Sequence, residues 1–228
     1  IPPVRMALLF SVMLVTAAGN TAMQSIMPAV GTALKVDDVF ISLAFSWSAL
    51  LWMLSAPTWA RRSDRRGRKA MMSLGLTGFV ASFALCGLML WLGLKGILGA
   101  TAALLLFAAA RAIYGMFGSA SPPAVQAYVA SRTVPEQRTQ ALSVIASSFG
   151  LGTVIGPALA PLLIFPPFGL IGPFLAFVLV AIATQISLKL FLPDDDPAFA
   201  ARGSVVASPD SAGADSRIGA EEIEDDFP

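Results

Sequence analysis

The chain has 228 residues, of which 56% are hydrophobic and 13% are charged, and its formal net charge is +1. A soluble domain carries charge on about a quarter of its residues, so this composition excludes an ordinary soluble domain and indicates a lipid bilayer as the solvent. With no histidine and one cysteine, the sequence also excludes Ser-His-Asp and Cys-His catalysis, imidazole-bound zinc and an internal disulfide, and we expect no enzyme activity and no cofactor.

Six apolar stretches are long enough to cross a membrane, because a helical span needs about 20 residues. They are expected at approximately Met6–Val30, Val39–Trp59, Ala70–Trp91, Ile97–Ala120, Ala141–Ile164 and Leu170–Leu192. The predicted fold is therefore an all-α membrane protein, with residues 1–192 forming a six-helix transmembrane bundle. From Pro193 the chain is acidic and poor in aromatics, so residues 193–228 are expected to be a disordered cytoplasmic linker or a tail without a role.

Positive charge is concentrated in two connections, "RRSDRRGRK" (Arg61–Lys69) and "SRTVPEQR" (Ser131–Arg138), whereas the other three are nearly neutral. The positive-inside rule places these two connections, the N-terminus and the C-terminal tail in the cytoplasm. We expect a multi-pass protein of the bacterial inner membrane with both termini inside. Because the chain starts at Ile1 and ends within a polar tract, we also expect it to be part of a longer protein.

The first span carries two amides, Asn20 and Gln24. They are four residues apart and therefore share one face of a helix. They are expected either to line a cavity or only to hold neighbouring helices together.

The connection after the second span contains one acid, Asp64, among its basic residues. A topological signal explains the positive charge, and that interpretation remains open. It requires neither Asp64 nor Gly67. Glycine at position 67 can supply a positive φ for a tight turn, and the Asp64 carboxylate can accept backbone N–H groups at a helix N-terminus.

Arg111 lies about 14 residues into the fourth span, roughly 21 Å from its start. A buried guanidinium costs several kcal/mol unless it is satisfied, and none of the six spans contains Asp or Glu. We therefore expect a functional role for Arg111, with Tyr114 one turn away. A structural arginine bonded to carbonyl groups is the alternative. The prolines of "SPP" (Ser121–Pro123) predict either a kink or the end of this helix.

The fifth span carries a small-residue stripe, because Ser148, Gly152, Gly156 and Ala160 recur every four residues. Such a stripe lets another helix approach closely. Pro157 removes a backbone donor and is expected to bend the helix.

Three motifs together resemble the signatures of the major facilitator superfamily. They are "DRRGRK" (Asp64–Lys69), "RAIYG" (Arg111–Gly115) and "GTVIGPALAP" (Gly152–Pro161), and the last resembles the fifth-helix motif of that superfamily's drug:proton antiporters. The resemblance covers approximately Met6–Leu192 and implies the N-terminal half of a twelve-helix fold. Departures from the motifs occur at Ala60, Ala160 and Pro161.

The resemblance also implies roles for three groups of residues. A cytoplasmic gate that contacts the other half would consist of Asp64, Arg65, Gly67, Arg68 and Lys69. A central cavity that takes part in coupling would contain Arg111, with Asn20, Gln24 and Tyr114 beside it. A fifth-helix conformational motif, facing the second half or, without it, lipid, would consist of Gly152, Gly156 and Pro157.

The function expected from these residues is proton-coupled export of small drug-like or lipophilic solutes by alternating access. Its partners would be the solute, protons, the bilayer and a C-terminal six-helix half, with no nucleic acid. Many antiporters of this type carry an acid on helix one, where this chain has Asn20 and Gln24. The acids near the pathway in this half are Asp37, Asp38 and Asp64, all at the membrane edges, so the coupling carboxylate is expected to be one of these or to lie in the other half. A facilitator or symporter that imports an anionic metabolite or sugar is the alternative. A non-transporting six-span scaffold is a third possibility.

Overall fold

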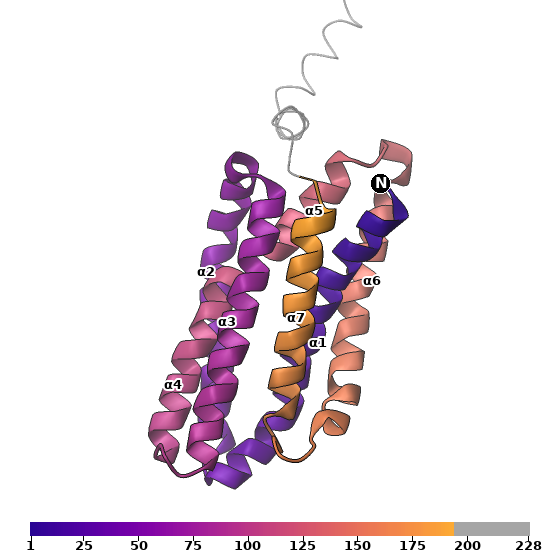
Figure 1. The fold of residues 1–228 in the computed structure, drawn as a ribbon. Helices are drawn as coiled ribbons and strands as arrows, with labels where there is room; N and C mark the ends of the chain where they lie inside the picture. Colours follow the sequence, from indigo (N-terminus) through magenta and orange to yellow (C-terminus); the bar gives the residue numbers. More distant parts are fainter. Residues whose placement is uncertain (194–228) are drawn as a thin grey trace, which may run out of the picture.

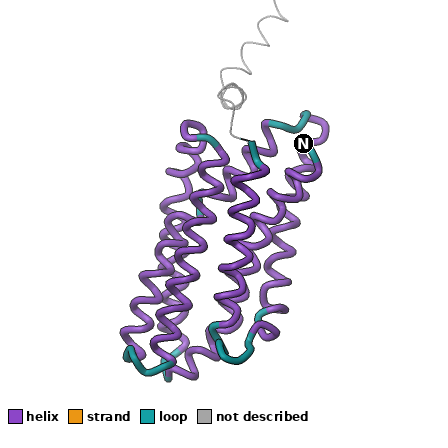
Figure 2. The backbone as a smooth tube through the Cα atoms, in the orientation of Figure 1, coloured by secondary structure: helices purple, strands orange, loops and turns teal. Residues whose placement is uncertain are grey.

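The computed structural model describes residues 1–193, except for the side chains of Asp64 and Arg65. The helices run side by side and reverse direction at short connections (Figure 1). In chain order the elements are α1 (Pro3–Leu34), α2 (Asp38–Arg66), α3 (Arg68–Leu94), α4 (Ala100–Ile113), the π-helical turn η1 (Tyr114–Gly118), α5 (Ser121–Ser131), α6 (Pro135–Leu159), the 3-10 turn η2 (Pro161–Leu163) and α7 (Gly172–Phe191). Within the described residues, six helical segments are long and apolar enough to span a membrane. Apart from the turn at residues 119–120 inside the fourth span, the connections lie at the two ends of the bundle (Figure 2). The predicted all-α class is therefore confirmed.

The fourth and fifth spans differ from their predicted bounds. The fourth span continues to Ser131 through α4, η1 and α5, so the alternative that "SPP" ends this helix is wrong. Pro122 and Pro123 lie in the first turn of α5, where the missing N–H groups have no intrahelical partner to lose. The fifth span begins at Pro135 rather than Ala141, and the second basic connection shrinks to residues 132–134.

The bundle is centred on α1 and α3. In their most apolar windows 61% and 50% of residues are buried, against 17% for α2 and 22% for α6. Aromatic side chains fill the interior between α3 and η1, where the ring centroids of Phe79 and Phe83 lie 4.0 Å apart and those of Phe79 and Tyr114 5.6 Å apart. Consequently α1 and α3 hold the core, whereas α2 and α6 expose apolar side chains outward.

Helix α6 packs closely on α1 through the small-residue stripe. A Cβ atom at Gly152 would lie 2.7 Å from the Leu14 carbonyl oxygen, and one at Gly156 would overlap the Ala18 carbonyl. The expectation that this stripe faces lipid or a second half is therefore wrong. The reason is that α1 presents its own small residues, Ala17 and Ala18, to the same contact, so two backbones can approach within this chain. Pro157 lies in the last turn of α6.

One end of the bundle collects the N-terminus, the α2–α3 connection and the α5–α6 connection (Figure 1). We call it the basic end. The α2–α3 connection is the single residue Gly67, which has φ +88°, as predicted for a tight turn. The Arg68 guanidinium donates to Ser131 Oγ, and Lys69 Nζ donates to the Lys189 carbonyl at 3.2 Å. The predicted acidic linker lies outside the described residues, apart from Pro193.

Candidate functional site

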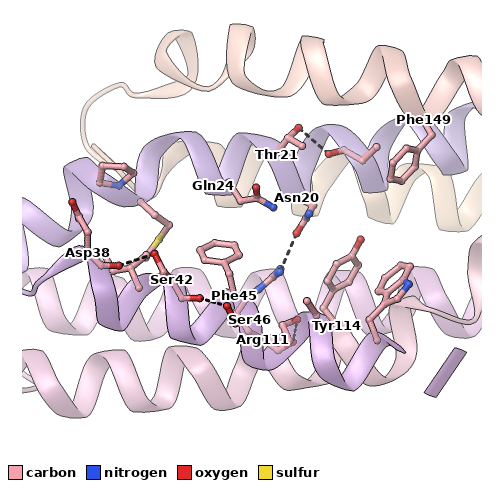
Figure 3. Close-up of a pocket in the computed structure, with 17 residues that line it drawn as sticks. Asn20, Thr21, Gln24, Asp38, Ser42, Phe45, Ser46, Arg111, Tyr114 and Phe149 are labelled. Carbon is pink, nitrogen blue, oxygen red and sulfur yellow. Dashed lines mark hydrogen bonds between the residues drawn. The ribbon is translucent and has the colours of Figure 1, made fainter. Parts of the chain in front are cut away.

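A cavity of about 780 Å³ lies between α1, α2 and the fourth span. Its walls are mainly apolar, with a few polar groups converging from different helices (Figure 3). The lining residues that carry the argument below are Asn20, Gln24, Asp38, Phe45, Trp52, Arg111, Tyr114 and Phe149. A cavity of this size suits a drug-sized molecule.

Arg111 is 3% exposed and reaches across the cavity from α4. Its Nη2 donates to Asn20 Oδ1 at 3.0 Å, and its guanidinium carbon lies 4.8 Å from the Phe45 ring centroid and 5.1 Å from that of Tyr114. Its Nε and Nη1 are buried without a hydrogen-bond partner. The site therefore holds a positive charge with one neutral acceptor, two aromatic faces and two unused donor nitrogens.

The π-helical turn after Arg111 is held by α2. Side chains of α2 reach carbonyl groups of the fourth span: Ser48 Oγ donates to Arg111 at 3.0 Å and Trp59 Nε1 to Met116 at 2.5 Å. Ser55 Oγ lies 3.1 Å from the Gly115 carbonyl and 2.7 Å from the Leu51 carbonyl of its own helix, and its one proton is shared between them. A π-helical turn disrupts the regular backbone bonds of an α-helix, and these donors satisfy carbonyl groups at the disruption. The same contact fixes the direction of Arg111 and Tyr114 relative to α2.

Predicted cavity residues come together here. Asn20 and Gln24 lie one turn apart on α1 and both line the cavity, beside Arg111 and Tyr114. Of the two amides, only Asn20 has a recorded hydrogen bond to Arg111, and Gln24 is exposed. Asn20 fits both predicted roles. It lines the cavity, and its hydrogen bond to Arg111 joins α1 to α4.

Sequence reasoning named Asp38 only as an acid at the membrane edge near the pathway, and it did not assign the aromatic wall to the cavity. Asp38 is the first residue of α2, is exposed, and lies on the cavity rim. Phe45 and Trp52 follow at positions that share the same face of α2 as Asp38. The signal was present in the sequence as aromatic and polar residues repeating at intervals of three or four, but nothing in it showed which face met Arg111.

The other predicted groups lie elsewhere. Gly67, Arg68 and Lys69 lie at the α2–α3 connection and so at the basic end, while Gly152 and Gly156 lie in the α1–α6 contact. The side chains of Asp64 and Arg65 lie outside the described part of the chain. Among the described residues, no group of three or more His, Cys, Asp or Glu side chains is placed to hold a metal ion.

Comparison with known proteins gives the family. The model of the Major Facilitator Superfamily matches residues 9–212. The chain belongs to the Major Facilitator Superfamily. The predicted family is therefore confirmed. The prediction that the chain is a multi-pass membrane protein is confirmed as well.

Individual relatives of this superfamily cover most of the chain. This chain is 31% identical over 176 residues to the multi-drug resistance efflux pump PmrA homolog of Lactococcus lactis. The matched stretch covers 75% of this chain and 38% of that protein. The chain is 28% identical over 150 residues to multidrug resistance protein 3 of Bacillus subtilis, covering 66% of this chain and 27% of that protein. The chain thus spans less than half the length of these relatives.

The fold has a counterpart in a solved structure. The crystal structure of the human organic anion transporter MFSD10 (TETRAN) superposes with a TM-score of 0.62 at 23% identity, covering 85% of this chain and 49% of that one. At this identity the likeness shows the fold, which for this chain is that of one half of a Major Facilitator Superfamily transporter.

Proposed function

We propose that this protein is a secondary transporter that exports small, lipophilic or drug-like solutes by alternating access. The observation that carries the proposal is the cavity at Arg111, which combines drug-sized volume, aromatic walls and a buried polar cluster. Sites of this composition bind small organic molecules. The printed names of the Lactococcus and Bacillus relatives support export of drug-like solutes.

The proposed transporter works with a second six-helix half. Helices α2 and α6 both contribute to the cavity wall, and both expose large apolar side chains such as Met53 and Val154. A second half covering these helices would close the cavity on its open side. Rocking of the two halves would then expose the cavity alternately to each side of the membrane.

The proposed coupling ion is the proton. Within this part of the chain the cavity has one titratable carboxyl, that of Asp38 on its rim. We propose Asp38 as the proton site of this half, or else a carboxyl in the second half. If Asp38 carries coupling, Asp38→Asn will make flux independent of the pH gradient while the solute gradient still drives it.

The proposed orientation places the basic end in the cytoplasm of a bacterial inner membrane, with both chain termini on that side. Gly67, Arg68 and Lys69, together with Asp64 and Arg65, are proposed as the cytoplasmic gate. The Arg68–Ser131 hydrogen bond already ties this connection to the end of α5. Asp64→Asn is expected to slow transport without changing topology, and a flipped loop would instead favour a purely topological role.

The experiment that tests the transport proposal is flux in proteoliposomes containing the full-length protein. Arg111→Ala is expected to lower flux at least tenfold while the amount of protein in the membrane stays the same. Lys95→Gln, which removes a positive charge at a connection outside the cavity, is the matched control and is expected to keep wild-type flux. Wild-type flux in Arg111→Ala would contradict the assignment of this cavity.

A second candidate is a facilitator that imports an anionic metabolite. It is favoured by the positive charge of Arg111 and by the position of the acids in the six described spans, since Asp38 and Glu136 both lie in the first turn of a helix and none lies deeper. Collapsing the pH gradient separates the two. Flux of the solute against its own gradient stops in the exporter when the pH gradient is removed, whereas flux by the facilitator follows the solute gradient alone.

A further inference from the structure

The guanidinium of Arg111 lacks a counter-charge in the described part of the chain. The acids whose side chains are described are Asp37, Asp38 and Glu136, and each lies at the start of a helix. Asp38 is the one that lines the cavity, but it lies ten residues before Ser48 on α2, roughly 15 Å along the helix axis. Ser48 contacts the Arg111 backbone and therefore marks the height of Arg111 along α2. Asp38 lies about three turns of helix away from that height.

The groups packed around Arg111 are neutral, and several are already committed. Asn20 on α1 supplies one acceptor, and Ser48 on α2 donates its hydroxyl to a backbone carbonyl. On α3, Ser82 donates to the Ala110 carbonyl at 2.8 Å and Cys86 to the Phe107 carbonyl at 3.8 Å. None of these groups supplies a negative charge.

Two donor nitrogens of Arg111 thus remain for a ligand. Nε and Nη1 are buried and unbonded, although the side chain borders a cavity large enough for an organic molecule. An arginine guanidinium stays protonated and offers only donors. Its natural complement is an oxyanion, which accepts charge-assisted hydrogen bonds.

The remaining walls fit an apolar body. Phe45 and Tyr114 flank the guanidinium, while Trp52 and Phe149 line the cavity from α2 and α6. Aromatic rings in offset or edge-on contact would hold a flat ring system. A cation placed there would be repelled by Arg111, and a neutral solute would leave the buried charge without a counter-charge.

We propose that this cavity binds a small amphipathic organic monoanion, whose oxyanion accepts hydrogen bonds from Nε and Nη1 of Arg111 and whose ring packs among Phe45, Trp52 and Tyr114. The proposal rests on the cavity being the solute site of the proposed transporter and adds the charge of the solute. It holds for either direction of transport.

The test compares three probes that share one ring system and differ in charge: 2-naphthoate, 2-naphthol and 2-naphthylmethylammonium. Binding to the full-length protein is measured by titration calorimetry in nanodiscs of uncharged lipid, with empty nanodiscs subtracted. The expected result is 2-naphthoate binding at least tenfold more tightly than the other two. Equal affinities, a preference for the cation, or no saturable binding of 2-naphthoate would overturn the proposal.

Variants then test whether Arg111 is the residue that causes the preference for 2-naphthoate. Arg111→Gln is expected to weaken 2-naphthoate binding at least tenfold, which is about 1.4 kcal/mol, with little change for 2-naphthol, and Arg111→Lys is expected to keep part of the preference. Trp52→Ala should weaken all three probes alike, and Lys95→Gln should weaken none. An unchanged preference in Arg111→Gln would overturn the assignment. If that variant does not fold, the wild-type series decides.

The binding measurement is separate from transport. Tight, Arg111-dependent binding of 2-naphthoate without flux would leave the anion site standing and remove the proposed transport function. Flux of neutral or cationic solutes, with no anion preference in binding, would leave the transporter standing and remove the anion site.

Discussion

Gly156 of α6 lies directly against the backbone of Ala18 of α1, so closely that a Cβ atom at position 156 would overlap the Ala18 carbonyl oxygen. Thr21 on α1 also faces α6, since its Oγ1 lies 3.4 Å from the Gly152 carbonyl, although it is closer to the Ala17 carbonyl of its own helix, at 2.9 Å. Asn20, the acceptor for Arg111, lies between Ala18 and Thr21 on the same helix. The stripe of α6 therefore packs on the same stretch of α1 that carries the acceptor for Arg111.

Gly156→Leu is expected to destabilise the protein, because the added side chain has no space between α1 and α6. Overpacking of this kind costs about 1–3 kcal/mol, and the unfolding temperature in detergent should fall. Gly150→Ala, on the same helix with no atom within 4 Å of the added Cβ, is the matched control and should unfold at or above the wild-type temperature. Equal stability of the two variants would contradict the close contact.

Asn20→Asp is expected to separate stability from binding. A carboxylate 3.0 Å from Arg111 Nη2 would form a hydrogen bond between two charged groups, in place of one from the guanidinium to a neutral amide. The unfolding temperature should be kept or raised, whereas affinity for 2-naphthoate should fall at least tenfold because the cavity loses its net positive charge. A stable variant that still binds 2-naphthoate normally would contradict the role of charge.

Ser55→Ala tests the support of the π-helical turn. The Ser55 hydroxyl lies 3.1 Å from the Gly115 carbonyl and 2.8 Å from Ser119 Oγ, besides the Leu51 carbonyl of its own helix at 2.7 Å. Its removal should cost about 1 kcal/mol, measured as a lower unfolding temperature. Ser147→Ala removes an exposed hydroxyl that bonds only along its own helix and should change stability by less than about 0.5 kcal/mol.

The orientation of the bundle can be measured by cysteine labelling. Cys86 is buried, and Cys86→Ser provides a background without thiols. Val134 at the basic end is 55% exposed and Ile97 at the opposite end 65%, so each is replaced by cysteine in turn. An impermeant maleimide added to intact cells should label position 97 at once and position 134 only after permeabilisation. The reverse pattern would contradict the proposed cytoplasmic basic end.

The sequence by itself determined the six spans and the grouping of basic connections at one end. Both are local properties, because hydropathy summed over about 20 residues decides whether a segment enters the bilayer. The positive φ of Gly67 is a local property too, because a glycine has no Cβ atom and can adopt this conformation without strain. Arg111 was also singled out from the sequence, because a charge in an apolar span is conspicuous.

Only the tertiary structure decided what Arg111 and the α6 stripe contact. Asn20 and Arg111 are 91 positions apart, and their hydrogen bond depends on how α1 and α4 are rotated and shifted against each other. The same holds for Gly156 against Ala18, and for Asp38 on the cavity rim. A periodic pattern shows which residues share a face of one helix. It does not show which helix that face meets, because that choice is made by packing among all six spans together.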